Sequence, residues 1–234
     1  MSSLLPFTEE HRMFKKTVST FVDREIRPFV ELWETEGRTP RSVWKKCGQL
    51  GFLGITYPEK YGGMNADYAY SYVFCLEMGK CGSGGVALGI SVQTDMATPA
   101  LAKHGSDYLK ETYLKPAISG DMICSIAVTE PGHGSDVAGI QTQAIRDKDD
   151  YLINGRKMFI TNATQADFMT VLARTSPGND YQGMSLFVVP TQLPGVSVGK
   201  PLRKTCYPSS DTAEVIFENV RVPKENLIGQ EGLG

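Results

Sequence analysis

The chain has 234 residues, of which 41% are hydrophobic and 21% are charged, and its formal net charge is −2 at pH 7. This length and composition are typical of a globular protein with one large or two modest domains. The near-neutral charge gives no basic surface for nucleic acid, and no apolar run approaches the ~18 residues of a membrane span. We therefore expect a protein that neither binds nucleic acid nor spans a membrane.

The cysteines and the N-terminus indicate the compartment. An odd number of cysteines without a C-x-x-C pair argues against a disulfide framework and a cysteine zinc site, and favours a reducing compartment. They are Cys47, Cys75, Cys81, Cys124 and Cys206. Glu9 and Glu10 interrupt an N-terminus that has no long apolar segment, so we expect no signal or transit peptide. The prediction is the bacterial cytoplasm, or the mitochondrial matrix only where a transit peptide is absent from this sequence.

Residues 1–122 are predicted to form an all-α domain. Thr8 is a candidate N-cap, apolar residues then recur at helical spacing, and Pro28 should kink or end this first helix. Further helices are predicted at 40–50, 68–80, 86–103 and 107–116, separated by glycine-rich or proline-containing segments. Methionine and aromatic residues in these segments are interpreted as core, and His104 as a helix-end histidine.

Residues 123–234 are predicted to form a β domain, because short apolar runs alternate with Gly, Pro, Asn and Asp. Asn154-Gly155, between two such runs, is typical of a hairpin turn. The expected strands are 123–129, 142–145, 151–153, 157–161, 168–174, 184–190, 196–198 and 213–218. Their number and spacing indicate a small antiparallel barrel or a sandwich. The predicted fold class is α+β, a helical domain followed by a small antiparallel β-barrel.

The first candidate site is the loop at residues 128–136, with the sequence VTEPGHGSD. Gly132 and Gly134 allow a close approach of the backbone, and such loops can direct several N–H groups at one anion. The alternative is a simple turn between strands. Val137 excludes the G-x-G-x-x-G fingerprint, and Ile140-Gln141 exclude a P-loop. Any phosphate would have to be bound in another way.

The second candidate site is the run at residues 157–162, with the sequence KMFITN. In a strand Phe159 and Thr161 share one face, where a ring beside a hydroxyl could cover a flat heterocycle. The alternative is an ordinary strand without a ligand. Glu130 and Asp136 are interpreted as turn-stabilising carboxylates, and Ser135 has no nearby base. From the residues alone, the prediction stops at a helical and β protein that could hold a flat anionic ligand.

The three histidines are isolated from one another, and none has a His or Cys partner at ligand spacing. They are His11, His104 and His133. No metal site is therefore predicted.

Four segments resemble the acyl-CoA dehydrogenase family. Residues 128–136 and 154–162 (NGRKMFITN) are similar to its two flavin-binding signatures. Residues 50–63 (LGFLGITYPEKYGG) resemble its N-terminal loop, and residues 211–223 (DTAEVIFENVRVP) resemble a β segment near the end of its middle domain. The resemblance covers nearly the whole chain. It implies a helical domain and a β domain, with FAD bound between the β domain and a C-terminal four-helix domain and completed by a neighbouring subunit.

The resemblance also implies the site residues. Ile126 to Thr129 would contact the flavin ring, Gly134 and Ser135 the pyrophosphate, and Phe159 to Thr161 the flavin face and its reactive nitrogen region. The cofactor-binding set is Ile126, Ala127, Val128, Thr129, Gly134, Ser135, Phe159, Ile160 and Thr161, and the substrate-binding set is Ser135 and Thr94. Many family members have Trp where Phe159 stands. Residues 204–209 (KTCYPS) lack the usual Gly-x-Arg/Lys pattern.

The implied reaction converts a fatty acyl-CoA to a trans-2-enoyl-CoA, with an electron-transfer flavoprotein-type acceptor and a homo-oligomeric enzyme. The family's catalytic glutamate lies in its C-terminal domain, so no residue here is assigned as the base. This 234-residue chain alone is expected to be inactive and to bind FAD weakly. Two alternatives stay open, namely a truncated, non-catalytic flavin-, CoA- or partner-binding module and a flavin oxidase or monooxygenase of the same fold.

Overall fold

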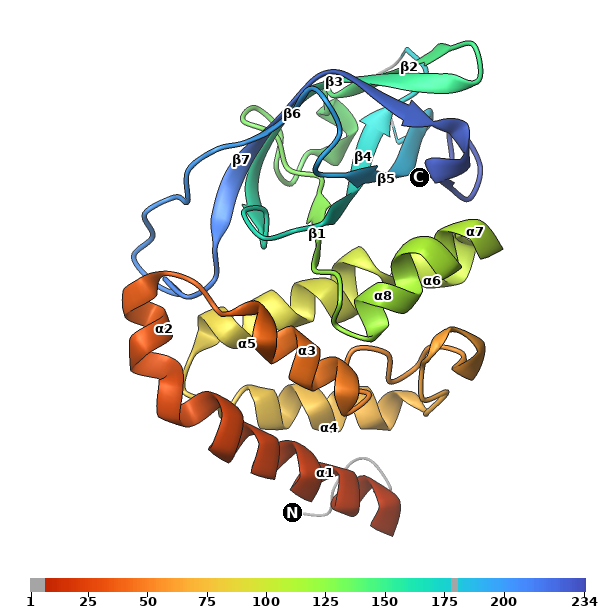
Figure 1. Cartoon of the computed structure of the whole chain (residues 1–234). Coiled ribbons are helices and arrows are strands. Elements are labelled where there is room, and N and C mark those ends of the chain that lie inside the picture. Colours follow the sequence, from red (N-terminus) through yellow and green to blue (C-terminus); the bar gives the residue numbers. More distant parts are fainter. Residues whose placement is uncertain (1–6, 178–180) are drawn as a thin grey trace.

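The structure is a computed structural model and describes residues 7–177 and 181–234 (Figure 1). Helices fill the first part of the chain and strands the second, which confirms the α+β class. The helices are α1 (Glu9–Phe21), α2 (Val30–Glu36), α3 (Arg41–Gln49), α4 (Tyr68–Met78), α5 (Gly84–Ser91), α6 (Pro99–His104), α7 (Asp107–Leu109) and α8 (Lys115–Ile118). The strands are β1 (Cys124–Ala127), β2 (Gln143–Asp147), β3 (Asp150–Thr161), β4 (Phe168–Arg174), β5 (Met184–Pro190), β6 (Val196–Val198), β7 (Thr212–Pro223) and β8 (Leu227–Ile228).

Helix α1 begins as its sequence predicts. The Thr8 side chain accepts a hydrogen bond from the His11 backbone N–H, and His11 Nδ1 accepts one from the Thr8 N–H, which forms a capping box. Toward its end the helix widens into a π-helical turn (Val22–Ile26) and then tightens into a 3₁₀ turn (Arg27–Phe29). This change occurs at Pro28, which lacks an N–H and cannot continue an α-helix. The predicted break is confirmed.

The single helix predicted at 86–103 is wrong, because this segment forms α5, a π-helical turn (Val92–Ala97) and α6. Pro99 lacks the N–H that a continuous helix would need, and the Thr98 N–H and hydroxyl both bond to the Gln93 carbonyl. The buried Gln93 side chain donates to the Ala117 carbonyl over 2.9 Å. It also accepts a hydrogen bond from the Cys124 N–H over 3.2 Å, which ties this turn to β1.

The strands form one mostly antiparallel sheet with the order β6-β7-β3-β2-β4-β5-β8, and β1 pairs with β4 in parallel. Only the Gln143–Arg174 pair joins β2 to β4. In the part of the chain that the structure describes, the end strands β6 and β8 do not pair with each other. The prediction of a closed barrel is therefore wrong. The strands form a curved sheet that stays open between β6 and β8.

The predicted hairpin turn at Asn154-Gly155 is also wrong. Both residues lie inside β3, where the register with β7 shifts between Ile153 and Gly155. The turn falls instead between β2 and β3, where Asp147 pairs with Asp150. Gly155 has φ +155°, and an added Cβ would lie 2.4 Å from the Thr142 hydroxyl oxygen. Glycine at this position allows a β-bulge in β3 and a close approach of β3 to Thr142.

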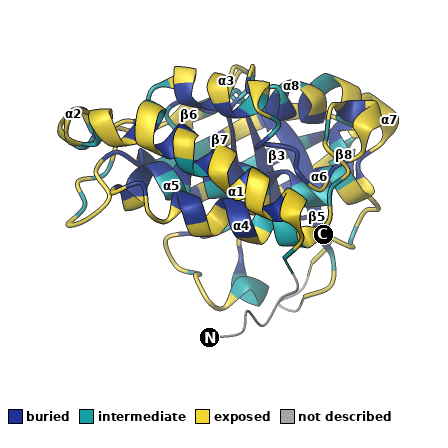
Figure 2. Cartoon of the chain, turned by 90° about the horizontal axis from the view of Figure 1, so that it is seen from below, coloured by how far each residue is buried: buried dark blue, intermediate teal, exposed yellow. Residues whose placement is uncertain are grey.

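Helices and strands share part of their core. Leu101, Leu114 and Ala117 pack in one buried cluster with strand residues such as Phe168 and Val188. Figure 1 shows α6 and α8 next to the sheet, with α1 and α4 on the side away from it. Seen from that side, α1 and α4 carry exposed residues on their outer faces (Figure 2). The division at residue 122 stays a prediction.

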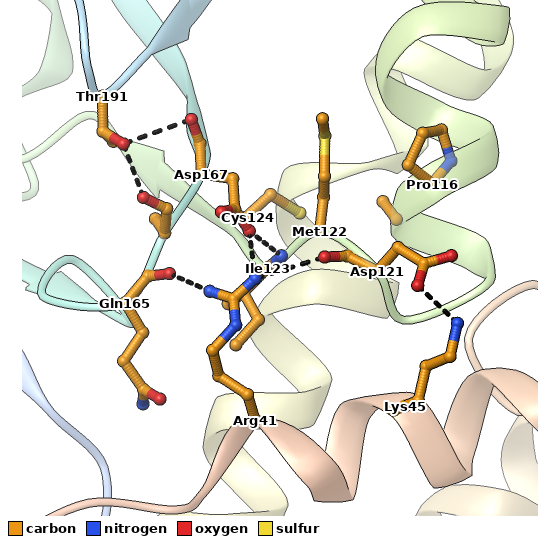
Figure 3. A network of polar contacts seen from close by, with 12 residues as sticks. Arg41, Lys45, Pro116, Asp121, Met122, Ile123, Cys124, Gln165, Asp167 and Thr191 are labelled. Atoms are coloured by element: carbon orange, nitrogen blue, oxygen red, sulfur yellow. Dashed lines mark hydrogen bonds and ion pairs between the residues drawn. The ribbon is translucent and has the colours of Figure 1, made fainter.

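A polar network also joins the two parts (Figure 3). Arg41, the first residue of α3, donates to the Gln165 carbonyl and to the Asp167 carboxylate, each over 2.7 Å, and to the Asp121 carbonyl over 3.2 Å. The same Asp167 oxygen accepts a hydrogen bond from the Ile123 N–H over 2.7 Å. One guanidinium therefore holds the connector before β1 against the segment before β4.

Candidate functional site

The loop at 128–136 leaves the end of β1 and closes on itself. Glu130 and His133 exchange two backbone hydrogen bonds of 2.9 and 3.2 Å, which make a tight turn. The buried Glu130 carboxylate accepts the N–H groups of Gln141 and Thr142 over 2.6 and 2.9 Å. The Glu130 carboxylate thus ties the start of the loop to the segment that follows it, and for Asp136 a turn-stabilising role stays a prediction.

The glycines in and after this loop differ in the space that surrounds them. An added Cβ at Gly132 or Gly134 would meet nothing within 4 Å, and neither residue has a positive φ. At Gly139, by contrast, an added Cβ would lie 2.2 Å from His133 Nδ1. A larger residue at 139 would therefore displace the His133 side chain, whereas one at 132 or 134 would displace nothing. The open side of these two glycines can accommodate a molecule from outside the chain.

The run at 157–161 contains a second bulge of β3. The register with β7 shifts between Lys157 and Ile160, and within this interval Phe159 has φ +60°. Such a backbone conformation is strained for an aromatic residue. Residue Phe159 is 62% exposed, Thr161 is half-buried and Ile160 is buried. The bulge therefore presents an aromatic ring at the surface while its neighbour fills the core.

Three contacts bring the two runs together. The Met158 N–H donates to the Thr129 carbonyl over 2.8 Å, and Lys157 Nζ donates to the Val128 carbonyl over 2.8 Å. Lys157 Nζ also pairs with the Glu130 carboxylate over 2.9 Å. Sequence reasoning included Lys157 in a motif but missed this pairing. The available signal was a lysine within a strand whose neighbours are apolar.

The environment of the ion pair shifts both pKa values. Burial lowers the pKa of Lys157, and the Glu130 carboxylate only partly opposes this effect. Burial raises the pKa of Glu130, but hydrogen bonds from Thr142, Gln141 and Lys157 outweigh it and hold that pKa below its usual value. Both side chains are almost inaccessible, with exposed fractions of 0% and 5%.

The remaining predicted site residues differ in their exposure to solvent and in their location. Ser135 is exposed and Ile126 is half-buried, whereas the Ala127 side chain is wholly buried in the sheet core. Ala127 and Ile160 could therefore contact a ligand only through their backbones. Thr94 lies in the π-helical turn before α6 and lines a separate cavity of about 280 Å³ with Tyr57 and other residues of the helical part. The described contacts do not join Thr94 to the two loops.

The unusual run at 204–209 lies against the helices. The Ser209 N–H and hydroxyl donate to the Glu34 carboxylate over 3.0 and 2.8 Å, and Ser83, the N-cap of α5, donates to the same group. An added Cβ on Gly84 would overlap the Tyr207 ring. This loop therefore docks on α2 and on the start of α5, as its path in Figure 1 shows.

Two of the three histidines lie near carboxylates. His11 Nε2 lies 3.2 Å from the Asp67 carboxylate, and His133 Nδ1 lies 3.9 Å from that of Asp136. His104 ends α6, as predicted. Within residues 7–177 and 181–234, no three His, Cys, Asp or Glu side chains are grouped closely enough to hold a metal ion. All five cysteines are free thiols, and over the same residues no helix is long and apolar enough to cross a membrane.

Two family models match the chain. The N-terminal domain model of acyl-CoA dehydrogenase matches residues 8–121, and the middle domain model matches residues 125–220. An acyl-CoA dehydrogenase of Bacillus subtilis (strain 168) is 39% identical over 227 residues, which cover 97% of this chain and 60% of that relative.

Solved structures agree with these matches. An acyl-CoA dehydrogenase from Geobacillus kaustophilus superposes with a TM-score of 0.93 at 43% identity, over 98% of this chain and 60% of that one. A glutaryl-CoA dehydrogenase from Mycobacterium smegmatis, in complex with FADH2, gives a TM-score of 0.89 at 33% identity, over 97% and 57% of the two chains.

Fold and comparisons together identify the family. The chain belongs to the acyl-CoA dehydrogenase family, of which it contains the N-terminal and middle domains. It spans about 60% of the length of the relatives named above.

Proposed function

We propose that this chain supplies one wall of an FAD and acyl-CoA site for the α,β-dehydrogenation of a fatty acyl-CoA to a trans-2-enoyl-CoA. One observation carries the proposal: two segments that resemble flavin signatures are fastened together by Lys157 and Met158. On the same segments the strained Phe159 ring is exposed, and open space lies beside Gly134. Strain of this kind is concentrated at functional sites.

The residues present fit this cofactor. The exposed Phe159 ring offers a flat apolar face, the half-buried Thr129 and Thr161 offer hydroxyls, and the open backbone at Gly134 and Ser135 offers N–H groups for a diphosphate. We assign the flavin ring to the first three residues and the diphosphate to the other two. When bound, FAD would supply the oxidising chemistry by accepting a hydride, while the chain orients it and excludes water.

For the substrate we propose an acyl-CoA thioester that contacts the exposed Ser135. Thr94 is a second proposed contact, but the structure places it in another cavity of the chain. The Thr94 hydroxyl donates to Asp95 over 2.9 Å, so substrate would have to compete with this hydrogen bond.

The two loops offer no suitable base. The Glu130 carboxylate is buried and already accepts hydrogen bonds from three donors, and Asp136 is exposed. We therefore propose that the α-proton is removed by a glutamate outside residues 1–234. We expect no turnover when the 234-residue chain is mixed with an acyl-CoA and an artificial electron acceptor. Robust turnover would contradict this assignment.

The family also suggests an electron acceptor, an oligomeric state and a metabolic role for the whole protein. We propose an electron-transfer flavoprotein-type acceptor, assembly into a homo-oligomer and a role in fatty acid β-oxidation. The five free thiols are in keeping with a reducing compartment, for which we propose the bacterial cytoplasm.

The open glycine provides the test. We expect Gly134→Ala to leave the free energy of unfolding within about 0.5 kcal/mol of the original, because the added methyl group meets open space. FAD affinity, measured by flavin fluorescence, should fall because the methyl group occupies the proposed path of the diphosphate. Gly199→Ala is the matched control, since Gly199 has no positive φ and its Cβ would have no neighbour closer than 3.4 Å. Unchanged FAD affinity in Gly134→Ala would remove Gly134 from the site.

The hydroxyls are tested separately. The double variant Ser135→Ala and Thr161→Val should bind FAD more weakly than the original chain and shift its reduction potential. If both quantities are unchanged, neither hydroxyl belongs to the site.

A further inference from the structure

We propose that Lys157 and Glu130 are positioning residues that set the distance between the two flavin-lining segments without touching the flavin. This inference rests on the proposed function, because it assigns a role toward the cofactor of that site. The pair would hold Thr129 and Phe159 in place before FAD arrives.

The contacts form a ladder between two short stretches of chain. On one side stand Val128, Thr129 and Glu130, and on the other stand Lys157 and Met158. Lys157 Nζ donates to the Val128 carbonyl, the Met158 N–H donates to the Thr129 carbonyl, and Lys157 Nζ donates to the Glu130 carboxylate. These three hydrogen bonds measure 2.8, 2.8 and 2.9 Å. Three consecutive residues are therefore fixed to two others that lie 27 to 29 positions further along the chain.

Neither member of the pair can reach a ligand directly. The Lys157 side chain has no exposed surface and that of Glu130 has 5%. The residue that follows this ladder in β3 is Phe159, and Thr129 lies within the ladder itself. Any contact of the ion pair with FAD must therefore pass through the residues that it holds, which are Thr129, Phe159 and the half-buried Val128.

Stability alone gives a poor reason for such a pair. Removing two charges from water has a large desolvation cost, so well-packed apolar residues often stabilise a fold as well as a buried ion pair. An apolar side chain at 157, however, could not donate to the Val128 carbonyl. The lysine fixes a backbone position, which is a specific geometric task.

The bulge at Phe159 explains why the backbone has to be fixed at this position. A residue held at φ +60° persists only where its surroundings determine the backbone on both sides. Before Phe159 the chain is held by the Met158–Thr129 hydrogen bond. After it, the Asn162 N–H donates to the Asp211 carbonyl over 2.9 Å. Lys157 secures the first of these two anchors.

The test compares three variants of this chain, Lys157→Met, Glu130→Gln and the double variant that combines them. Lys157→Met leaves a buried carboxylate without its cation, whereas the double variant removes both charges. Lys224→Met is the matched control, because Lys224, just after β7, forms an exposed pair over 2.8 Å with Asp149 in the turn between β2 and β3. For each chain the urea midpoint, the FAD dissociation constant and the visible spectrum of bound flavin are measured.

We expect Lys157→Met to lower both the urea midpoint and the FAD affinity, the latter at least tenfold. The double variant should regain much of the midpoint but keep the tenfold loss of affinity and an altered flavin spectrum, since the donor to Val128 is still missing. The control should keep the original affinity and spectrum. If FAD affinity instead recovers together with the midpoint, the pair only stabilises the fold and the inference is overturned.

Amide hydrogen exchange separates this inference from the proposed function. We expect the Met158 amide to exchange faster in Lys157→Met, by at least tenfold more than the amides within β4 and β5, which follow the change in global stability. Uniform acceleration, or no change at Met158, would overturn the positioning role. This readout needs no flavin, so failure of the original chain to bind FAD would contradict the proposed function alone. If Lys157→Met does not fold, the double variant, which has no unpaired buried charge and still lacks the donor to the Val128 carbonyl, carries the same comparison.

Discussion

The Asn162 side-chain amide donates a hydrogen bond of 2.8 Å to the carbonyl of Gly89, although 73 residues separate the two along the chain. Asn162 follows β3 at φ +64°, and the same amide donates to the Cys124 carbonyl over 3.3 Å. A Cβ on Gly89 would lie 3.1 Å from Asn162 Oδ1 and 3.4 Å from the Trp44 ring. One buried amide thus joins α5, β1 and the end of β3, at a place where the helix can approach closely.

Replacing this amide by a carboxylate should therefore cause a large loss in the free energy of unfolding. Asn162→Asp keeps the side-chain shape but sets two acceptors against each other, at an expected cost of about 2–4 kcal/mol at pH 7. The buried carboxyl would have a raised pKa in the folded state, so its protonated form favours folding. The defect should thus be smallest below about pH 4 and grow as the pH rises.

Urea unfolding at pH 4 and pH 7 measures this effect. Asn219→Asp is the control, because Asn219 also has a positive φ of +50° but lies at an exposed position. Equal losses of stability in the two variants would contradict the role of Asn162.

The Arg41 network gives a second prediction (Figure 3). Arg41→Met keeps much of the side-chain stem but removes the donors to Gln165, Asp167 and Asp121. The lost hydrogen bonds are partly exposed, so we expect a loss of about 1–2 kcal/mol in the free energy of unfolding. Denaturation followed by Trp fluorescence and by circular dichroism measures it.

A neighbouring ion pair provides the comparison for this network. Lys45→Met removes only the exposed ion pair with Asp121. Exposed pairs contribute little, so this variant should lose well under 1 kcal/mol. If Lys45→Met is as unstable as Arg41→Met, the bonds to Gln165 and Asp167 do not join the helices to the sheet.

We expect Phe159 to lower the stability of the chain without ligand while it increases the affinity for FAD. Phe159→Gly removes a ring that is 62% exposed and relieves a backbone at φ +60°. We expect the chain without ligand to be as stable as before or more stable, by up to about 1 kcal/mol. FAD affinity should nevertheless fall, because the flat apolar face is lost. Thermal unfolding and flavin fluorescence test the two effects, and a variant that is less stable with unchanged affinity would contradict both.

The lowered pKa of Glu130 predicts a dependence of stability on pH. A carboxyl whose pKa is lower in the folded than in the unfolded state stabilises the fold above its unfolded pKa of about 4.3. This contribution disappears as the pH falls through the folded-state pKa. The difference in free energy of unfolding between the original chain and Glu130→Gln should therefore be largest near pH 7 and shrink below about pH 4.

Urea midpoints at pH 7, 5, 4 and 3.5 would show this trend. Asp149→Asn is the control, because hydrogen bonding by Lys224 also lowers the pKa of Asp149 but the group is exposed. A constant difference between the original chain and Glu130→Gln over this range would show that the Glu130 carboxylate is not the titrating group.

Local pattern determined much of the fold from the sequence alone. The runs at 168–174, 184–190 and 196–198 are strands with the predicted bounds, because each is a compact apolar or alternating stretch between turn residues. The capping box at Thr8 and the break at Pro28 likewise depend on residues within one or two turns of helix. The family was identified from motifs, and most of the candidate site residues come from these motifs.

Tertiary structure decided the features that depend on distant partners. Asn154-Gly155 is typical of a hairpin, but here it forms a bulge because β7 pairs on both sides of it and Thr142 lies against Gly155. Over residues 7–177 and 181–234 the sheet does not close, because β6 and β8 lie at its opposite edges, and no local pattern encodes this order. The loop at 128–136 and the strand run at 157–161 were both visible in the sequence. Their ion pair was not, since burial in the fold brings together Lys157 and Glu130, which lie 27 residues apart.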